Sequence, residues 1–251
     1  MNIWRLEWLR LVRTHRLLAI LGVYVFFGLT GPLTVRYLSQ ILERLGTAGI
    51  EVRFPAPVPA DGIAQFTGDA AQIGLMVVVL VAGAALSFDN RREMAIFLRT
   101  RVNGVREVIL PAYATNAAAA VCGLLAGSLA AWYETAILIG PLPVARMILG
   151  IGLGALFLCF AVALVALMAS VVKGALATSG ISLAVLLALA IAGNLGGGQL
   201  TRWLPTTLSG AMAGLAGTAR PVDYLPAALV TVLASAASVW AAIVLASRRE
   251  L

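Results

Sequence analysis

Charge and the usual catalytic residue types are scarce in this chain. Only 12% of its residues are charged, about half the share in ordinary soluble proteins. His15 is the only histidine, so no site with several histidine ligands can form within one chain. The sequence has no GxxxxGK[ST], G-x-S-x-G or H-E-x-x-H motif. We therefore predict no catalytic residue, no metal ligand and no enzyme activity of its own.

Cysteine is also rare, and both cysteines lie within apolar runs. Cys122 and Cys159 are expected to be small buried hydrophobic residues and not a disulfide.

Long apolar runs are what the sequence has in place of charge. Its mean hydropathy is +0.97 and 61% of its residues are hydrophobic, and several runs approach the roughly 20 residues that a helix needs to cross a bilayer. This composition predicts a single all-α polytopic membrane domain over residues 1–251 with six transmembrane helices. The predicted spans are 17–42, 70–88, 108–131, 144–171, 176–195 and 226–246.

Two shorter regions complete the predicted architecture. Residues 196–225 are broken by Gly and Pro, which favours a short re-entrant helical segment before the last span. Prolines 55, 57 and 59 favour extended backbone in the outer segment before span two. GxxxG spacing at Gly123/Gly127, Gly150/Gly154 and Gly210/Gly214 favours close helix packing, although a chain with 25 glycines produces such matches by chance.

Residues 1–16 have amphipathic spacing. Trp4, Trp8, Leu11 and Val12 share one helical face. The opposite face carries Glu7, Arg10, Arg13 and Thr14. This pattern predicts an N-terminal interfacial amphipathic helix with its arginines toward the cytoplasm. A plain charged flank to the first span is the alternative.

The distribution of charge predicts the orientation. With the N-terminus inside, the inner segments carry twelve basic and five acidic residues, and the outer segments carry six of each. This asymmetry follows the positive-inside rule. It predicts that the protein lies in the cell (inner) membrane with both termini on the cytoplasmic side. The net charge of +7 is thereby explained without a nucleic-acid partner.

Acidic residues are expected only at the ends of the predicted spans, at Asp69, Asp89, Glu107 and Glu134. Ion-driven carriers usually have ionisable groups deep in their spans, because burying a charge there is costly without a role. A secondary carrier or a polytopic enzyme is therefore disfavoured. If the chain transports a substrate actively, its energy is expected to come from another chain.

The stretch SFDNRREMAIFLRTRVNGVREVILP, residues 87–111, is the densest run of charge. Asp89 or Asn90 can cap a helix that runs to Arg99, on which Met94, Phe97 and Leu98 form an apolar face. Such a helix suits docking into another protein. A solvated loop that only sets the topology is equally consistent with the spacing.

The layout resembles that of the permease subunits of type-2 ABC transporters. The resemblance rests on FFGLTGPLTVRYLSQIL at 26–42, FPAPVPADGIAQFTGDAAQI at 54–73, the charged block after span two, and RWLP at 202–205 before the last span. It implies a six-span exporter subunit that pairs with a second permease, homo- or heterodimeric, and with two cytoplasmic ATPase subunits. ATP and Mg would be bound by those ATPases and no cofactor by this chain. The other expected partners are membrane lipids.

The resemblance also implies which residues couple to the ATPase. The coupling region is 89–107, with its helix over 90–101, and a second contact lies at 171–178. The expected coupling residues are Asp89, Asn90, Arg91, Arg92, Glu93, Phe97, Arg99, Arg101 and Lys173. The chain departs from the family's Glu-x-x-x-Gly-Thr and Pro-x-Ser-Arg motifs, with Glu93-Met94 and RVNG at those places.

By the same analogy the path would follow spans one, two and five. Its candidate residues are Tyr24, Thr30, Tyr37, Gln40, Gln72 and Asn194. For each of them an interhelical hydrogen bond or an interface anchor is the more common role. The alternative function is a membrane assembly or scaffold factor that binds a cytoplasmic partner without transport.

Overall fold

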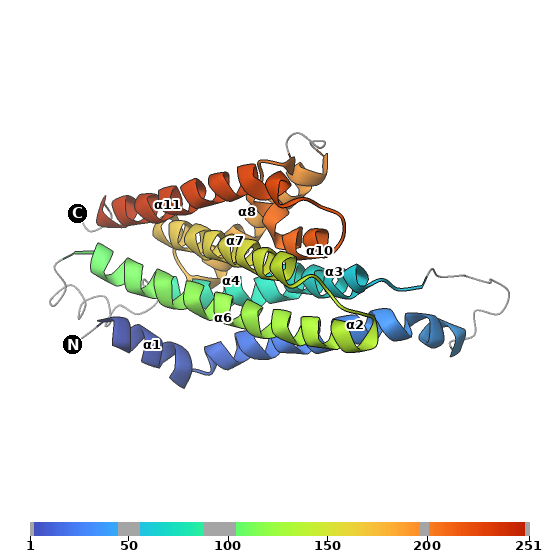
Figure 1. Ribbon diagram of the computed structural model, residues 1–251. Coiled ribbons are helices and arrows are strands. Elements are labelled where there is room, and N and C mark those ends of the chain that lie inside the picture. Colours follow the sequence, from blue (N-terminus) through green and yellow to red (C-terminus); the bar gives the residue numbers. More distant parts are fainter. Residues whose placement is uncertain (1–2, 45–55, 88–103, 196–200, 249–251) are drawn as a thin grey trace.

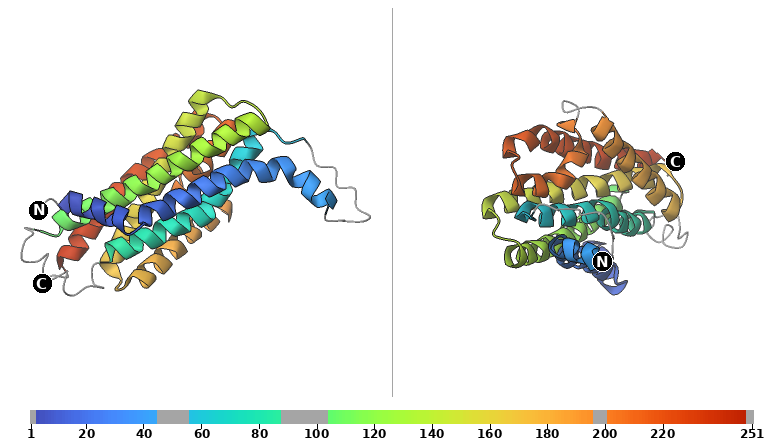
Figure 2. Two further views of the ribbon diagram at one scale, coloured as in Figure 1. Left: turned by 90° about the horizontal axis from the view of Figure 1, so that it is seen from below. Right: turned by 90° about the vertical axis from the view of Figure 1, so that its right-hand side faces the viewer.

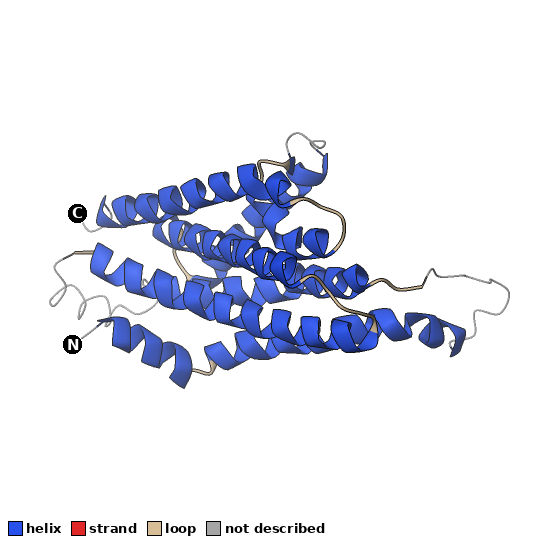
Figure 3. Ribbon diagram, in the orientation of Figure 1, coloured by secondary structure: helices blue, strands red, loops and turns tan. Residues whose placement is uncertain are grey.

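The computed structural model describes residues 3–44, 56–87, 104–195 and 201–248, with the side chains of 39–44 and 194 excepted. Every regular element in these ranges is helical (Figure 3). Six helical segments within these ranges are long and apolar enough to cross a membrane. The chain is therefore an all-α, multi-pass membrane protein with six spans, as its composition predicts.

The elements alternate direction along the bundle (Figure 1). The first span is α2 (Arg16–Arg44). The second is one continuous span made of α3 (Pro59–Asp69), the π-helix η1 (Ala70–Gly74) and α4 (Leu75–Leu86). The third is α6 (Arg106–Leu138). The later spans are α7 (Val144–Val171), α8 (Ala175–Leu195) and α11 (Leu225–Arg248). The starts of α1 and α6 and the end of α11 lie at one end of the bundle, called the inner end here after the predicted orientation.

Helix α7 is the centre of the bundle. It packs against α4, α6, α8, α10 and α11, and nearly every residue from Phe157 to Ala166 is buried. A helix that is apolar on all sides is stable only when other helices surround it. Figure 2 shows α2 and α6 on one side of this centre and α8 and α11 on the other.

The second span begins eleven residues before the predicted start at residue 70. Pro59 occupies the first helical position, where its missing N–H costs nothing. The Asp61 carboxylate accepts a hydrogen bond from the Val58 backbone N–H at 2.9 Å and so holds the first turn. Ile63 and Phe66 are fully buried, which ties α3 to the bundle. The extended backbone predicted for this region is limited, within the described residues, to 56–58.

The third span is also longer than predicted. It was expected over 108–131, and α6 continues to Leu138. The extra turns are held by α3, because Gly62 lies against the side chains of Thr135 and Ile139. The prolines at 32 and 111 lie within α2 and α6 without ending either helix.

The segment before the last span folds back onto the bundle. Its described part consists of η3 (Pro205–Gly210), α10 (Ala211–Ala216) and η4 (Pro221–Tyr224). Leu208, Met212 and Leu215 are buried, and α10 packs on α7 and α3. Gly150 admits the Met212 backbone, since a Cβ at residue 150 would lie 2.6 Å from the Met212 Cα. This is the short re-entrant helical segment that the sequence predicts.

The closest helix pair is α2 with α6. Gly123 and Gly127 of α6 lie against Ile20 and Tyr24, and Gly28 of α2 lies against the Gly127 backbone. A Cβ at Gly127 would lie 2.8 Å from the Tyr24 carbonyl carbon. The first GxxxG pair therefore serves the close packing that its spacing suggests.

Helix α1 (Ile3–Arg13) joins α2 through His15, which has a φ of 57° in the left-handed region. Trp4, Trp8 and Val12 are exposed, but Leu11 and Glu7 are buried where α1 packs on α6. The prediction that Glu7 belongs to the polar, water-facing side is therefore wrong. Docking against α6 turns this carboxylate inward, 3.6 Å from the Arg10 guanidinium.

Replacing Gly127 with Ala should lower the free energy of unfolding by about 1–3 kcal/mol, the usual cost of overpacking. The matched control is Gly152→Ala on α7, which has open space around its Cβ position and should be neutral or stabilising by up to about 1 kcal/mol. Thermal unfolding in detergent micelles measures both. Equal stability of the two variants would contradict the close packing of α2 on α6.

The docking of α1 should depend on pH. Burial raises the pKa of Glu7 above its ordinary value of 4.5, and Arg10 and Arg16 oppose this only in part. The docked helix therefore binds a proton more readily than the undocked one, so docking weakens as the pH rises from 4.5 through the raised pKa and stays constant above it.

Hydrogen exchange of the α1 amides, corrected for intrinsic rates, should show more protection at pH 5 than at pH 8. The expected ratio is up to about tenfold for each unit by which the pKa is raised. In Glu7→Gln this pH dependence should vanish. Identical pH dependence in the wild type and the variant would refute the assignment.

Candidate functional site

Of the nine expected coupling residues, only Lys173 lies within the described residues. Lys173 is exposed in the short connection between α7 and α8 at the inner end of the bundle. The next residue, Gly174, has a φ of 93°, a conformation that glycine adopts without strain. The other eight lie outside the described residues: Asp89, Asn90, Arg91, Arg92, Glu93, Phe97, Arg99 and Arg101.

The ends of the two predicted coupling segments are joined by a small polar cluster, the inner clasp, formed by Ser87, Thr178 and Ser179. Ser87 follows α4 and its hydroxyl donates to Thr178 Oγ1 at 3.2 Å. Ser179 Oγ donates to the Val79 carbonyl at 3.3 Å, where Gly83 makes room for it. All three side chains are buried. The clasp therefore fastens the start of α8 to the end of α4 directly beside both segments.

The candidate pathway residues do not form one site within the chain. Tyr24 is fully buried inside the bundle, and Tyr37 is 41% exposed near the far end of α2. Thr30 is half-buried and donates its hydroxyl to the Phe26 carbonyl of its own helix at 2.8 Å. Gln72 is exposed on η1. Gln40 and Asn194 lie on α2 and α8, and their side chains are outside the described part.

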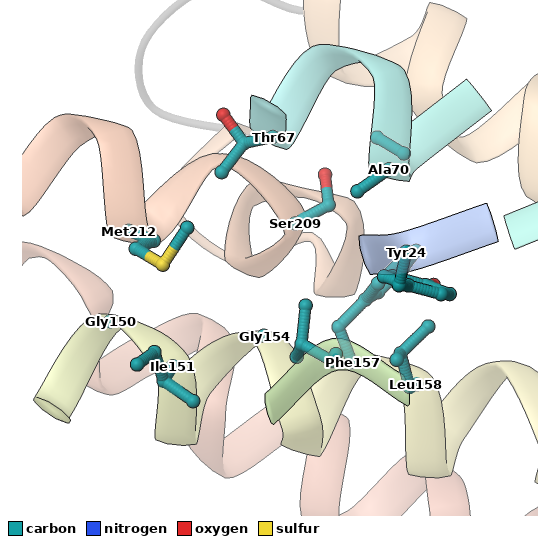
Figure 4. A pocket seen from close by; sticks show the side chains of 12 residues that line it. Tyr24, Thr67, Ala70, Gly150, Ile151, Gly154, Phe157, Leu158, Ser209 and Met212 are labelled. Atoms are coloured by element: carbon teal, nitrogen blue, oxygen red, sulfur yellow. The ribbon is translucent and has the colours of Figure 1, made fainter. Parts of the chain in front are cut away.

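A cavity lies between the re-entrant segment and the centre of the bundle. Its volume is about 380 Å³ when the open space at its mouth is counted. Tyr24, Thr67 and Ser209 supply its polar groups, and Figure 4 shows them around a wall that is otherwise apolar. The Thr67 hydroxyl donates to Ile63 and Ala64 carbonyls, and Ser209 donates to Thr206. Because these hydroxyls bond to their own helices, the cavity offers little polar recognition.

Asp69 is the clearest departure from the sequence-based expectations. It was placed at the end of a span, but it is the last residue of α3 and is followed directly by η1 and α4 in one continuous helical span. Gln65 Nε2 donates to its carboxylate at 3.2 Å. Among the described residues Asp69 forms no ion pair.

Contacts with α2 set the depth of Asp69. Gly31 of α2 lies against Phe66, and Tyr24 of α2 lies against Gly74, so Asp69 lies at a level between Gly31 and Tyr24. The nearest charged residues on α2 are Arg16 and Arg36, which are separated by about 30 Å of helix, the thickness of the hydrocarbon core. Asp69 therefore lies level with this apolar stretch of α2, at least about 7 Å from the level of Arg36.

Asp69 belongs to a polar stripe, defined here as Gln65, Asp69 and Gln72. Gln65 and Gln72 are exposed and Asp69 is half-buried, on the side of the span opposite to buried Ile63, Phe66 and Ala70. The stripe interrupts an otherwise apolar surface. Exposed polar groups at this depth are unfavourable against lipid and usually face a water-filled space or another subunit.

Gln65 and Asp69 were not among the candidate site residues predicted from the sequence. Three prolines and two glycines in 55–68 suggested an outer loop that would keep Asp69 in water. The signal that could have found them is the pairing of Pro59 at the first helical position with Asp61, followed by Ile63 and Phe66 at helical spacing. The π-helix directly after Asp69 is a second signal, visible only in the structure, since such segments are frequent at functional sites.

Metal-binding clusters and disulfides are absent from the described ranges. Within them no group of three or more His, Cys, Asp or Glu side chains lies close enough to hold a metal ion. Both cysteines are free. Cys159 is half-buried, but Cys122 is exposed on the outer surface of α6, so the expectation that both are buried is wrong for Cys122.

Comparison of the sequence with protein-family models and with curated proteins gives no match.

The inner clasp provides a test of its own. Thr178→Val keeps the shape of the side chain but removes the acceptor of the Ser87 hydroxyl, so the free energy of unfolding should fall by about 1 kcal/mol. Thr30→Val is the control, because the Thr30 hydroxyl bonds only within α2, and its change should be smaller. Thermal unfolding of both variants measures the two changes. An equal loss of stability in Thr178→Val and Thr30→Val would mean that the clasp adds nothing to helix packing.

Proposed function

We propose that this protein is the membrane-spanning permease subunit of an ATP-driven exporter. The observation that supports this most is the inner clasp. It joins α4 and α8 at the point where both predicted coupling segments meet the bundle, so a force applied to either segment would move both helices together.

The distribution of chemistry supports the same proposal. The described residues form a helical scaffold with one polar stripe in the membrane and a hydrogen-bonded clasp at the inner end. The sequence has no phosphate-binding motif for an ATPase of its own. A partner ATPase on the inner side would supply the energy, and a second permease subunit would complete the path.

Asp69 favours a second candidate, a carrier driven by a cation gradient. A carboxylate inside the membrane is the feature that such carriers need and that the sequence appeared to lack. Among the described residues, no second ionisable group lies beside this carboxylate. A single carboxylate is a minimal basis for coupling transport to a cation gradient, so we rank this function below the ATP-driven one.

The charged block tests the two candidates against each other. Phe97→Asp, or Arg91→Glu together with Arg92→Glu, should leave the protein inserted but detach its ATPase, because an apolar anchor or the basic charge of the predicted docking segment is lost. Arg202→Glu, an exposed arginine at the opposite end of the bundle, is the control and should retain the ATPase.

The measurements are co-purification of the ATPase and vanadate-sensitive ATP hydrolysis in the purified complex. The variants in the charged block should lose most of the bound ATPase and most of the vanadate-sensitive ATP hydrolysis. Arg202→Glu should retain both. Transport that ignores vanadate and stops when an ionophore dissipates the ion gradient would refute the exporter and support the carrier.

A further inference from the structure

We propose that the polar stripe of Gln65, Asp69 and Gln72 is a binding site for a protonated amine. The proposal deepens the proposed function, on which it rests for the step of transport, by naming the chemical class of the substrate. Binding itself requires no ATPase.

The depth of the stripe makes a purely structural role costly. Asp69 lies between the levels of Tyr24 and Gly31 on α2, inside the apolar stretch between Arg16 and Arg36. A negative charge there costs several kcal/mol unless a cation or water compensates it. No described basic side chain pairs with it, so a cation bound from another molecule can supply the compensation.

The hydrogen bonding of the stripe determines which kind of cation fits. A carboxylate only accepts hydrogen bonds, so Gln65 must present its amide nitrogen to Asp69, as the 3.2 Å contact from Nε2 shows. The Gln65 carbonyl oxygen then remains an acceptor. Gln72 lies next along the same exposed side and offers a second amide oxygen. An ammonium group has three donors and no acceptor, which matches this set of oxygens.

The surroundings of the stripe are apolar and suit the rest of such a molecule. Exposed Ile73, Met76 and Leu80 continue along the span toward the inner end. Leu29 and Leu33 are exposed on the outer half of the neighbouring α2. An amine attached to a hydrophobic body would therefore place its charge at Asp69 and its body against this surface.

Binding can be measured on the intact protein in lipid nanodiscs. The probe is dansylcadaverine, which carries a primary ammonium, and its N-acetylated form is the neutral match. Fluorescence anisotropy, with empty nanodiscs subtracted to remove partition into lipid, gives the dissociation constant of each. The wild type should bind the ammonium at least tenfold more tightly than the acetylated probe.

Asp69→Asn removes the charge, keeps the size and can still bond to Gln65, and it should weaken ammonium binding about tenfold or more. Asp61→Asn is the control, because Asp61 is an exposed carboxylate two turns earlier on the same helix. This variant should bind the ammonium probe as tightly as the wild type. Equal binding of both probes, no signal above empty nanodiscs, or unchanged binding in Asp69→Asn would each overturn the proposal. Charge-dependent binding in a protein that fails to hold an ATPase would instead refute the exporter and leave the site in place.

Discussion

The packing of Tyr24 fixes the register of the helices on which the rest of the structure depends. Its ring lies against Gly74 of the second span, and its backbone lies against Gly127 of α6. Three helices therefore meet at a side chain that is fully buried. Interiors of this density tolerate little sliding, because one added methylene already costs free energy. The register of α2, α6 and the second span follows from this contact.

That register decides what the second span can do. It brings Phe66 level with Gly31 and so sets Asp69 level with the apolar stretch of α2 between Arg16 and Arg36. The same continuous span ends at Leu86, one residue before the inner clasp. The polar stripe and the clasp are thus joined by one helical segment, and the π-helix in this segment carries Gln72 of the stripe. In the proposed exporter, movement at the inner end would reach the amine site along this segment.

The sequence allowed the helical class, the six spans and the re-entrant segment to be predicted, because runs of about 20 apolar residues have few other solutions. It misled at Pro59, where a helix-breaking residue in fact starts a helix whose first turn is held by the Asp61 carboxylate. It also misled at Glu7, because the side of α1 that docks on α6 carries both Glu7 and Leu11, which the pattern assigned to opposite faces.

The candidate site was predictable only in part. Gln72 could be named as a polar residue in an apolar run, but Gln65 and Asp69 depended on where the second span begins. The clasp could not be predicted at all, because its hydrogen bonds join residues about ninety positions apart. Such contacts follow from tertiary packing and leave no local pattern.

The register of the second span against α2 can be measured directly by disulfide trapping. In a variant without Cys122 and Cys159, cysteines at Gly31 and Phe66 should oxidise rapidly to a disulfide, because a Cβ at residue 31 would lie 3.5 Å from the Phe66 Cβ, within the range for disulfides. If Gly31→Cys fails to link to Phe66→Cys and links instead to Ile73→Cys, two turns further along, the span is shifted outward. Asp69 would then lie in water, and the intramembrane polar stripe would not exist.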